Sequence, residues 1–442
     1  MSTAPRTVDS VIAARWVIPV EPARAVLTDH AVVVDGGRIV AVGPASEIRA
    51  GYTARRQLDL GEHVLIPGLI NLHTHAAMTL MRGLADDLAL MDWLNNHVWP
   101  AEMRHASEEF VYDGARLACA EMLRGGVTCF NDMYFFPRAT ARAALDARMR
   151  AAIGMIMVDF PSPYASDAQD YLSKSLQVRD ELGGESLLSW CFAPHAPYTV
   201  GDASLRQLAA YAGELDLPVH MHVHETRDEI ELSLKHHRVR PLERLAALGL
   251  VGPGLIAVHA IHLEHHEIEM LAQQGCHVAH CPSSNLKLAS GFAPIAALLA
   301  KSVNVGLGTD GAASNNRLDL FAEMRLAALL AKGVSGDATA LPAWQALEMA
   351  TLRPARALGL DAAIGSLLPG KCADLAAVRL SGIELAPCYD PLSHLVYAAG
   401  REHVSHVWVN GELVVDDGRL TTVDDRELEA RAAYWRNCIS AA

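Results

Sequence analysis

Eight apolar segments, each ending in polar residues, alternate with amphipathic helical patterns through the middle of this chain. The segments are residues 70–75, 127–132, 152–160, 187–195, 217–225, 255–262, 276–285 and 303–310. Between them, apolar residues recur at the i, i+3, i+4 and i+7 spacing of a helix, as at Leu205, Leu208, Ala209 and Ala212. Eight βα units in series predict an α/β fold, the (β/α)8 TIM barrel, in which functional groups lie at the C-terminal ends of the strands.

The two ends of the chain have a different sequence pattern, with short β-rich runs separated by tight turns. Residues 31–43 are two such runs around a Gly-bearing turn, and residues 407–415 carry the Asn-Gly signal of a type I′ hairpin. Neither end is long enough for an independent sandwich. We therefore predict that residues 1–66 and 368–442 form one composite β-sandwich domain, and that residues 67–367 form the barrel.

Composition and charge narrow the classes of function. The 442 residues are 51% hydrophobic, which is ample for a large core, and they carry a net charge of −14. This charge, without any basic stripe, disfavours nucleic acid and an anionic membrane surface as partners. No apolar run reaches the roughly 20 residues of a spanning helix, and the N-terminus lacks the apolar core of a signal peptide. Eight cysteines without a C-x-x-C pair indicate reduced thiols. These features predict a cytoplasmic enzyme with a small-molecule substrate.

The first apolar segment ends in two histidines, His73 and His75. Residues i and i+2 of a strand lie on the same face, so these two side chains can direct their imidazoles to one point. Neutral imidazole is the commonest metal ligand in proteins. Two hydrogen-bonded core histidines are the plain structural alternative, but a buried polar pair is costly unless something binds it.

Three further predicted strand ends carry candidate ligands. The fifth carries His220, His222 and His224 on one face, so parity does not choose among them; the sixth carries His259, and the eighth carries Asp310 among small residues. Two or three imidazoles and one carboxylate, with a position left for water, are typical of a catalytic site for zinc or a similar cation. Such a metal lowers the pKa of its bound water to about 7, and nearby acids can move protons to and from it. The predicted chemistry is hydrolysis at a carbon that bears nitrogen or halide.

These elements together resemble the amidohydrolase superfamily over essentially the whole chain. The resemblance rests on four elements in the right order: His73-x-His75, His222-x-x-Glu225, His259 and Asp310. The chain is similar to the branch that contains atrazine chlorohydrolase, guanine deaminase and the 5′-methylthioadenosine/S-adenosylhomocysteine deaminases. This branch usually binds one metal and lacks the carboxylated bridging lysine of its binuclear relatives. No lysine stands at the end of the third or fourth predicted strand.

The resemblance implies a role for each of these residues. The implied ligands of one divalent metal per subunit, zinc first and then iron or manganese, are His73, His75, His222 and Asp310. Asp310 would also take a proton from the metal-bound water, and His259 would hydrogen-bond the attacking hydroxide. Glu225 would shuttle protons and contact the substrate. Because its parity differs from that of His222, we expect Glu225 where the strand has begun to turn.

A finer resemblance links the chain to the deaminases of this branch, at residues 91–94, 99–102, 193–198 and 280–288. By that analogy Glu102 would accept hydrogen bonds from the ribose hydroxyls. His195 would contact the nucleoside, and Trp93 would supply an apolar wall, while Asp310 and Glu225 face the reacting ring.

The expected reaction is hydrolytic deamination. Metal-bound hydroxide would attack C6 of 5′-methylthioadenosine, S-adenosylhomocysteine or adenosine, which gives the inosine derivative and ammonia. One alternative keeps the scaffold and changes the substrate to a free heterocycle: guanine, a pterin or a triazine. Glu102 separates the two, since a bare heterocycle has no diol. A third reading is a non-catalytic barrel. The sequence leaves room for a homo-oligomer and leaves open the roles of His220 and His224.

Overall fold

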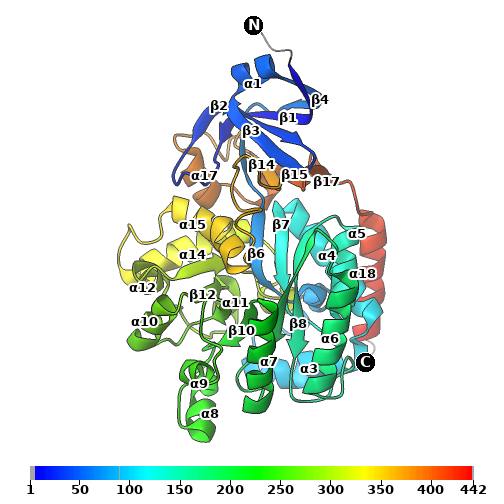
Figure 1. Cartoon of the computed structure of the whole chain (residues 1–442), viewed down its shortest axis with the longest axis vertical. Coiled ribbons are helices and arrows are strands. Elements are labelled where there is room, and N and C mark those ends of the chain that lie inside the picture. The colour runs from blue at the N-terminus through cyan, green and yellow to red at the C-terminus, as the bar shows by residue number, and fades with distance from the viewer. Residues whose placement is uncertain (1–4, 89, 441–442) are drawn as a thin grey trace.

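Eight parallel strands form the wall of a barrel, and a second sheet joins the two ends of the chain (Figure 1). The computed structural model describes residues 5–88 and 90–440. The barrel strands are β6 (Leu69–Thr74), β7 (Val127–Asp132), β8 (Arg150–Met157), β9 (Leu188–Pro194), β10 (Val219–Val223), β11 (Leu255–His259), β12 (His277–His280) and β13 (Asn304–Leu307). Each strand pairs with the next along the chain, so the predicted barrel fold is confirmed.

Side chains complete the barrel where the first and last strands meet. The Asn71 side-chain amide donates to Oγ1 of Thr309 across 2.8 Å, and the Thr309 backbone N–H donates to Oδ1 of Asn71 across 3.0 Å. One step further, the Asp310 backbone N–H donates to the carbonyl of His73, also across 3.0 Å. This seam places Asp310 directly beside the end of β6.

Some of the polar residues predicted at strand ends lie two or three residues past them. β10 ends at Val223 and β13 at Leu307, so Glu225 and Asp310 belong to the loops that follow. The strand predicted over residues 276–285 is wrong in its second half. β12 stops at His280, and Pro282 begins the helix α11 (Pro282–Lys287), because proline is well suited to the first turn of a helix.

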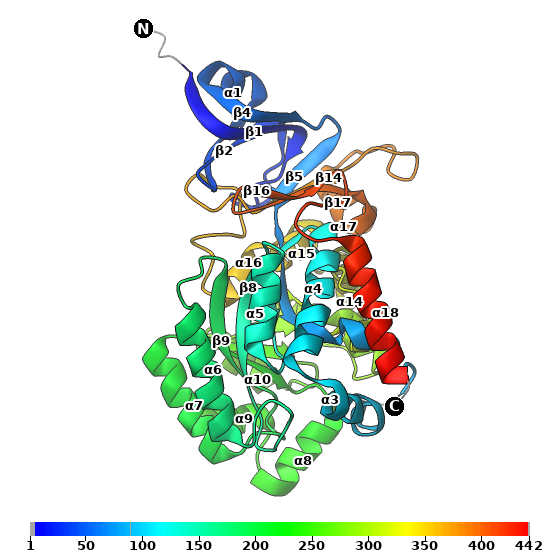
Figure 2. The ribbon, with the colours of Figure 1, turned by 90° about the vertical axis from the view of Figure 1, so that its right-hand side faces the viewer.

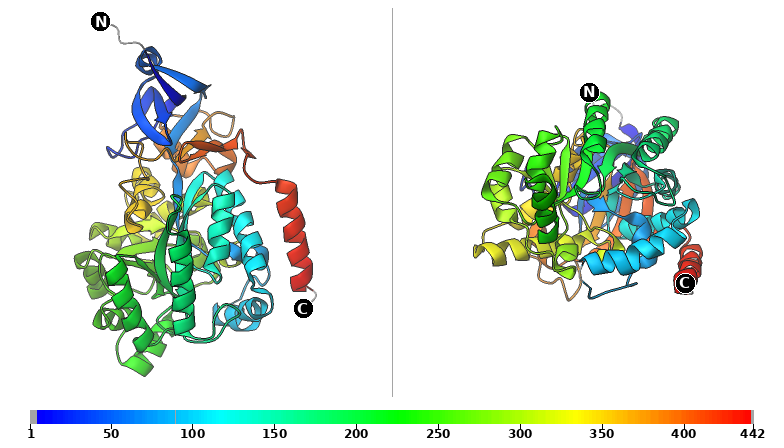
Figure 3. Two further views of the ribbon diagram at one scale, coloured as in Figure 1. Left: turned by 45° about the vertical axis from the view of Figure 1, so that its right-hand side comes forward. Right: turned by 90° about the horizontal axis from the view of Figure 1, so that it is seen from below.

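Helices surround the strands when the barrel is viewed along its axis (Figure 3, right). Those between barrel strands include α4 (Glu108–Arg124), α5 (Pro137–Asp146), α6 (Ala168–Leu182), α7 (Asp202–Leu215), α8 (Arg227–His237), α9 (Pro241–Ala247), α10 (His265–Gln273) and α12 (Ile295–Ala300). The last barrel strand, β13, is followed by α13 (Ala312–Asn315), α14 (Leu320–Ser335), α15 (Ala343–Met349) and α16 (Leu352–Ala357). The apolar stripe predicted in residues 205–212 is the buried face of α7, with Leu205 and Leu208 fully buried. Asp167 and Thr226 cap α6 and α8 by accepting a backbone N–H. Every helix in the described ranges is too short or too polar to cross a membrane.

The terminal sheet has nine strands drawn from both chain ends. They are β1 (Arg6–Val17), β2 (Leu27–Asp35), β3 (Arg38–Pro44), β4 (Tyr52–Asp59), β5 (His63–Pro67), β14 (Leu375–Arg379), β15 (Val404–Val409), β16 (Glu412–Asp416) and β17 (Arg419–Leu420), with the short helix α1 (Ala45–Gly51) beside them. β5 pairs antiparallel with β14 and so links the N-terminal part to the C-terminal part. Asn410 and Gly411 both have positive φ, 50° and 79°, as the predicted type I′ hairpin requires.

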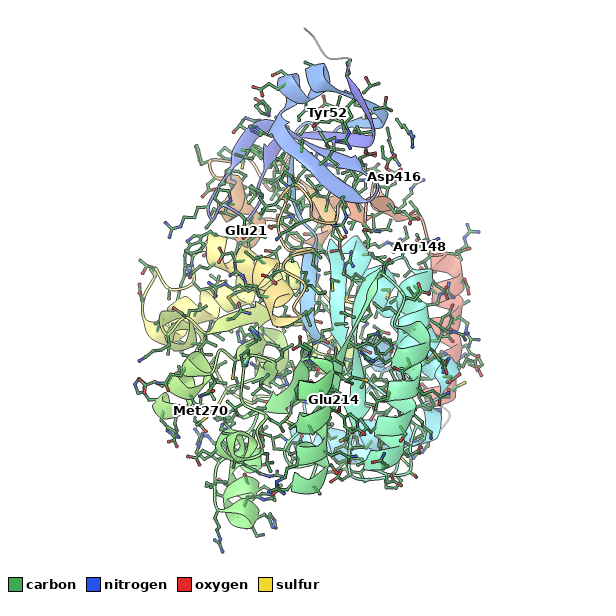
Figure 4. The ribbon with its side chains drawn as sticks, viewed as in Figure 1. Glu21, Tyr52, Arg148, Glu214, Met270 and Asp416 are labelled. Atoms are coloured by element: carbon green, nitrogen blue, oxygen red, sulfur yellow. The ribbon has the colours of Figure 1, made fainter. Side chains whose placement is uncertain are left out.

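Buried polar contacts fasten this sheet to the barrel. Arg150, at the start of β8, pairs with Asp374 just before β14 at 3.1 Å, and both side chains are buried. Glu21, labelled between the sheet and the barrel helices in Figure 4, accepts hydrogen bonds from Ser366 and Lys371. The opposite end of the barrel carries α3 (Trp99–His105) and α8 (Figure 2).

The last helices of the chain pack on the barrel. α17 (Pro391–Tyr397) contacts α14 and α15, and α18 (Asp425–Ser440) lies along α4 (Figure 3, left). The indole N–H of Trp435 donates to Asp113 across 2.8 Å, and the ring meets Phe110 edge-on with centroids 5.2 Å apart. The exact domain bounds, 1–66 and 368–442 against 67–367, stay a prediction.

The same helix α4 supports the turn that follows β6. Gly114 of α4 packs on the 3₁₀ turn η1 (Ala76–Met81), where an added Cβ would lie 2.5 Å from the carbonyl of Ala77. α18 also contacts η1. The C-terminal helix therefore braces the segment that immediately follows His75.

Candidate metal centre and active site

Four side chains from three strand ends converge at one point on the barrel axis. Ligand atoms of His73, His75, His222 and Asp310 all lie within 4.8 Å of one another. Nε2 of His73 and Nε2 of His75 are each 3.2 Å from Oδ1 of Asp310. Four ligands at about 2.0–2.2 Å from a tetrahedral zinc ion lie about 3.3 Å from one another. The donor set and its spacing therefore fit one zinc ion or a similar divalent cation.

Backbone carbonyls orient two of these imidazoles. Nδ1 of His75 lies 2.6 Å from the carbonyl of Met133, and Nδ1 of His222 lies 2.7 Å from the carbonyl of His195. A carbonyl can only accept, so Nδ1 carries the proton in both rings. That leaves the lone pair of Nε2 free for a metal, as such carbonyl partners do in known metal sites.

The three histidines of the fifth strand divide their roles. His222 joins the metal-binding group. His220 lies two residues earlier on β10, deeper in the barrel. Its Nε2 is 2.9 Å from Nδ1 of His73, so His220 supports the ring of His73. His224 faces away from the centre, where its Nε2 accepts the backbone N–H of Leu242 across 3.1 Å.

Asp310 is held by hydrogen bonds to both carboxylate oxygens. Its Oδ1 accepts the backbone N–H of Gly311 across 2.8 Å, and its Oδ2 accepts the hydroxyl of Ser284 across 2.6 Å. Burial alone would raise the pKa of Asp310, but the adjacent His73 and His75 hold it well below the usual range. These neighbours keep the carboxylate of Asp310 anionic. Its backbone is left-handed, with a φ of 62°.

A change of backbone direction brings Glu225 into the site. β10 ends at Val223, and His224 has a left-handed φ of 59°. The carboxylate of Glu229 accepts the backbone N–H groups of His224 and Glu225, at 2.9 and 2.8 Å, and so holds this turn. Burial raises the pKa of Glu225, which favours a carboxyl group that can carry a proton.

His259 follows the same pattern at the end of β11. Its φ is 68°, and its Nδ1 lies 2.8 Å from Oδ1 of Asn285. Its other nitrogen, Nε2, lies 3.8 Å from Oε1 of Glu225. The ring stacks over His222 with centroids 5.4 Å apart, so one face of His259 borders the metal-binding group.

A cavity of about 290 Å³ opens above this centre. Every predicted site residue except His73 lines it: Trp93, Glu102 and His195, together with His75, His222, Glu225, His259 and Asp310. His73 lies fully buried beneath the lining. Much of the remaining wall comes from the helical segment after η1, built of α2 (Leu90–Trp93), the π-helix η2 (Leu94–Val98) and α3. Residues 133–135, after β7, and residues 156–163, at the end of β8 and in its loop, supply another part.

Glu102, Trp93 and His195 form the wall beside the metal-binding group. Glu102 is only 6% exposed, so it is not a surface carboxylate, and burial raises its pKa to about 7. His195 lies with its ring 4.9 Å from that of His222, and burial lowers its pKa to about 3, so it is neutral. Trp93 is buried and presents its ring to the cavity.

Sequence reasoning missed three supporting residues: Ser284, Asn285 and Glu229. The first two lie in the segment 280–288, which carried part of the family resemblance. Ser284 contacts Asp310 and Asn285 contacts His259, each across a separation of 26 residues in the sequence. Glu229 lies one helical turn past Glu225. That spacing was the one local signal that could have suggested it.

Comparison with known proteins agrees with this geometry. The profile of the amidohydrolase family matches residues 64–414, and that of an imidazolonepropionase-like composite domain of bacteria matches residues 31–53. A protein of Teredinibacter turnerae named 5-methylthioadenosine/S-adenosylhomocysteine deaminase is 48% identical over 435 residues, which cover 98% of each chain.

Solved structures are similar over almost the whole chain. An adenosine deaminase from Xanthomonas campestris with bound zinc is 48% identical with a TM-score of 0.98, covering 99% of this chain and 100% of the other. Atrazine chlorohydrolase from Arthrobacter aurescens, complexed with zinc, is 25% identical with a TM-score of 0.90 over 97% of this chain and 100% of its own. With a matching profile over most of its length and relatives of this similarity, the chain belongs to the amidohydrolase family.

Proposed function

We propose that this protein is a metal-dependent aminohydrolase of adenine nucleosides. Its substrates are 5′-methylthioadenosine, S-adenosylhomocysteine and adenosine, and its products are the inosine derivatives and ammonia. The relatives that are 46–48% identical over nearly their whole length bear the name of this deaminase. The observation that carries the proposal is the shared cavity, which has the metal-binding group at its floor and the buried carboxylate of Glu102 in its wall.

Glu102 favours a nucleoside over a free heterocycle. A carboxylate that is 6% exposed pays a desolvation penalty that must be offset by a partner. The two hydroxyls of a ribose are donors that suit its two oxygens. A triazine, a pterin or guanine offers no diol, so the paired hydroxyl contact proposed for Glu102 would be absent with these substrates.

The ligand set fits a divalent cation, which when bound would supply a water of lowered pKa as the nucleophile. Asp310, held anionic by its histidine neighbours, accepts a proton from the attacking water. His259, oriented by Asn285, donates or accepts a hydrogen bond at the developing oxygen.

Glu225 moves the second proton. Because burial raises its pKa, it can hold a proton and deliver it to a ring nitrogen as water adds to C6. The C6–N bond then breaks, the amino group takes up a proton and leaves as ammonia, and a C6 carbonyl remains. The sum is one water consumed and one ammonia released.

An ultraviolet assay of the zinc-loaded protein tests the proposal. We expect deamination of adenosine and its thioether derivatives, no turnover of adenine, guanine or atrazine, and loss of activity on chelation. Glu102→Gln should weaken every nucleoside far more than any free base. Turnover of a free base alone would overturn the nucleoside assignment, and activity untouched by chelation would overturn the metal.

We also propose a cytoplasmic location. All eight cysteines are free thiols in the structure, as expected in a reducing compartment. A homo-oligomer stays a prediction that sizing chromatography with light scattering tests.

A further inference from the structure

The upper wall of the cavity is apolar and aromatic. Beyond the metal-binding group, the lining includes Trp93, Leu94, Val98, Trp99, Met103 and Phe160. Met103 and Phe160 are 58% and 42% exposed, so they mark the opening to solvent. Trp99 and Phe160 face each other there with ring centroids 6.4 Å apart.

The charged side chains in this lining are all acids. They are Glu102, Glu225 and Asp310, and no lysine or arginine lines the cavity in the described part of the chain. Lys287, which precedes the lining residue Leu288, is already engaged by Asp86 at 2.7 Å and by the carbonyl of Ala313 at 2.9 Å. The upper wall therefore offers aromatic faces and no cation.

This wall determines what the 5′ substituent of a nucleoside meets, on the basis of the proposed function. With C6 at the metal-binding group and the ribose diol at Glu102, the 5′ position is left to the apolar wall. A methylthio group is small and uncharged, and its sulfur gains favourable contacts with aromatic rings. The cavity, at about 290 Å³, also lies just below the range of about 300–1,000 Å³ for ligand pockets.

The homocysteine tail meets a worse environment. Its carboxylate would lie against apolar side chains or beside acids, with no cation to pair with, and burying an unpaired charge is costly. Its ammonium could reach only carboxylates that the reaction or the ribose already uses. The tail gains little and loses hydration.

We propose that the site is selective for adenine nucleosides with a small, uncharged 5′ substituent, and that it prefers 5′-methylthioadenosine to S-adenosylhomocysteine. The discrimination comes from the apolar upper wall. It acts on the 5′ arm alone and leaves the chemistry at C6 unchanged.

The first test measures kcat/KM of the zinc-loaded enzyme for 5′-methylthioadenosine, 5′-deoxyadenosine, adenosine and S-adenosylhomocysteine. We expect the methylthio substrate to exceed the homocysteine substrate by about tenfold or more, the factor that an unfavourable contact of modest size produces. Equal or better turnover of S-adenosylhomocysteine would overturn this selectivity while leaving the deaminase intact. Failure to deaminate any nucleoside would overturn the proposed function instead.

A second test adds the missing cation at the opening. Met103→Arg should raise the ratio of kcat/KM for S-adenosylhomocysteine over 5′-methylthioadenosine by about tenfold at low ionic strength, with the gain reduced in 0.5 M salt because exposed charges are screened. Leu329→Arg, which adds the same charge on the exposed face of α14 outside the cavity lining, should leave the ratio within about twofold of the starting enzyme. A ratio that Met103→Arg does not raise, or that Leu329→Arg raises equally, would overturn the electrostatic argument.

Discussion

Ser284 fixes the carboxylate of Asp310, because its hydroxyl donates to Oδ2 across 2.6 Å while Oδ1 faces His73 and His75. The next residue, Asn285, accepts a hydrogen bond from Nδ1 of His259 through its Oδ1, across 2.8 Å. One turn of α11 therefore orients both a member of the metal-binding group and the histidine that stacks beside it.

Removing the Ser284 hydroxyl should loosen the metal. In Ser284→Ala, Oδ2 of Asp310 loses its donor, so we expect zinc affinity to fall about 10- to 100-fold, as for other partners of metal ligands. Competition with a chelating dye measures this directly, without an activity assay. Ser233→Ala removes another buried hydroxyl, one that donates to the carbonyl of Val239 away from the centre, and it should leave the affinity unchanged. Equal losses in the two variants would contradict the positioning role.

The turn that carries Glu225 depends on Glu229. In Glu229→Gln, an amide replaces one of the two carboxylate oxygens that accept the N–H groups of His224 and Glu225. A small displacement of Glu225 should lower kcat by about 10- to 100-fold with little change in KM. Steady-state kinetics measure kcat and KM separately and so check this expectation. A change confined to KM would show that Glu229 acts on binding rather than on the proton shuttle.

Nucleoside binding should strengthen as pH rises through neutrality. Burial raises the pKa of Glu102 to about 7, so the carboxyl is protonated below that pH and ionised above it. The ionised form accepts from both ribose hydroxyls. We therefore expect KM for 5′-methylthioadenosine to fall between pH 6 and pH 8. In Glu102→Gln, whose side chain does not titrate, KM should stay constant across this range. If KM of that variant still falls with pH as in the starting enzyme, another group causes the effect.

Loss of the C-terminal anchor should cost stability. Trp435 is 6% exposed, and Trp435→Ala removes both its packing on Phe110 and its hydrogen bond to Asp113. We expect the free energy of unfolding to fall by about 3 kcal/mol, measured by denaturant titration. Trp435→Phe keeps most of the packing and should lose about 1 kcal/mol, the value of one hydrogen bond. A smaller loss for the alanine variant than for the phenylalanine variant would contradict this account.

Local sequence rules were sufficient for the barrel and for the first ligand pair. Period-two alternation placed His73 and His75 on one face, and apolar periodicity located the eight strands. The alternation of side chains did not identify the metal-binding histidine of the fifth strand, because His220 and His222 share a face and differ only in depth along the barrel axis. The alternation does not apply to His224, since the strand has ended there and the backbone is left-handed.

The supporting residues that the sequence did not predict act through contacts between distant segments of the chain. Ser284 and Asn285 act on residues 26 positions away across neighbouring strand ends, so no local pattern reveals them. The strand predicted through Asn285 overlooked the proline at 282, which ends the β run and begins α11. The choice between 5′ substituents depends on the α2–α3 segment and the loop after β8, whose arrangement only the folded chain defines.

The left-handed backbone at His224, His259 and Asp310 has a consequence for engineering. A left-handed backbone costs about 1 kcal/mol or more at a residue other than glycine. The fold therefore loses stability at these three bends, which direct Glu225, His259 and Asp310 into the site. Substitutions that raise thermal stability by relaxing these three bends would lower kcat. Stabilising substitutions are better placed in the terminal sheet and the outer helices.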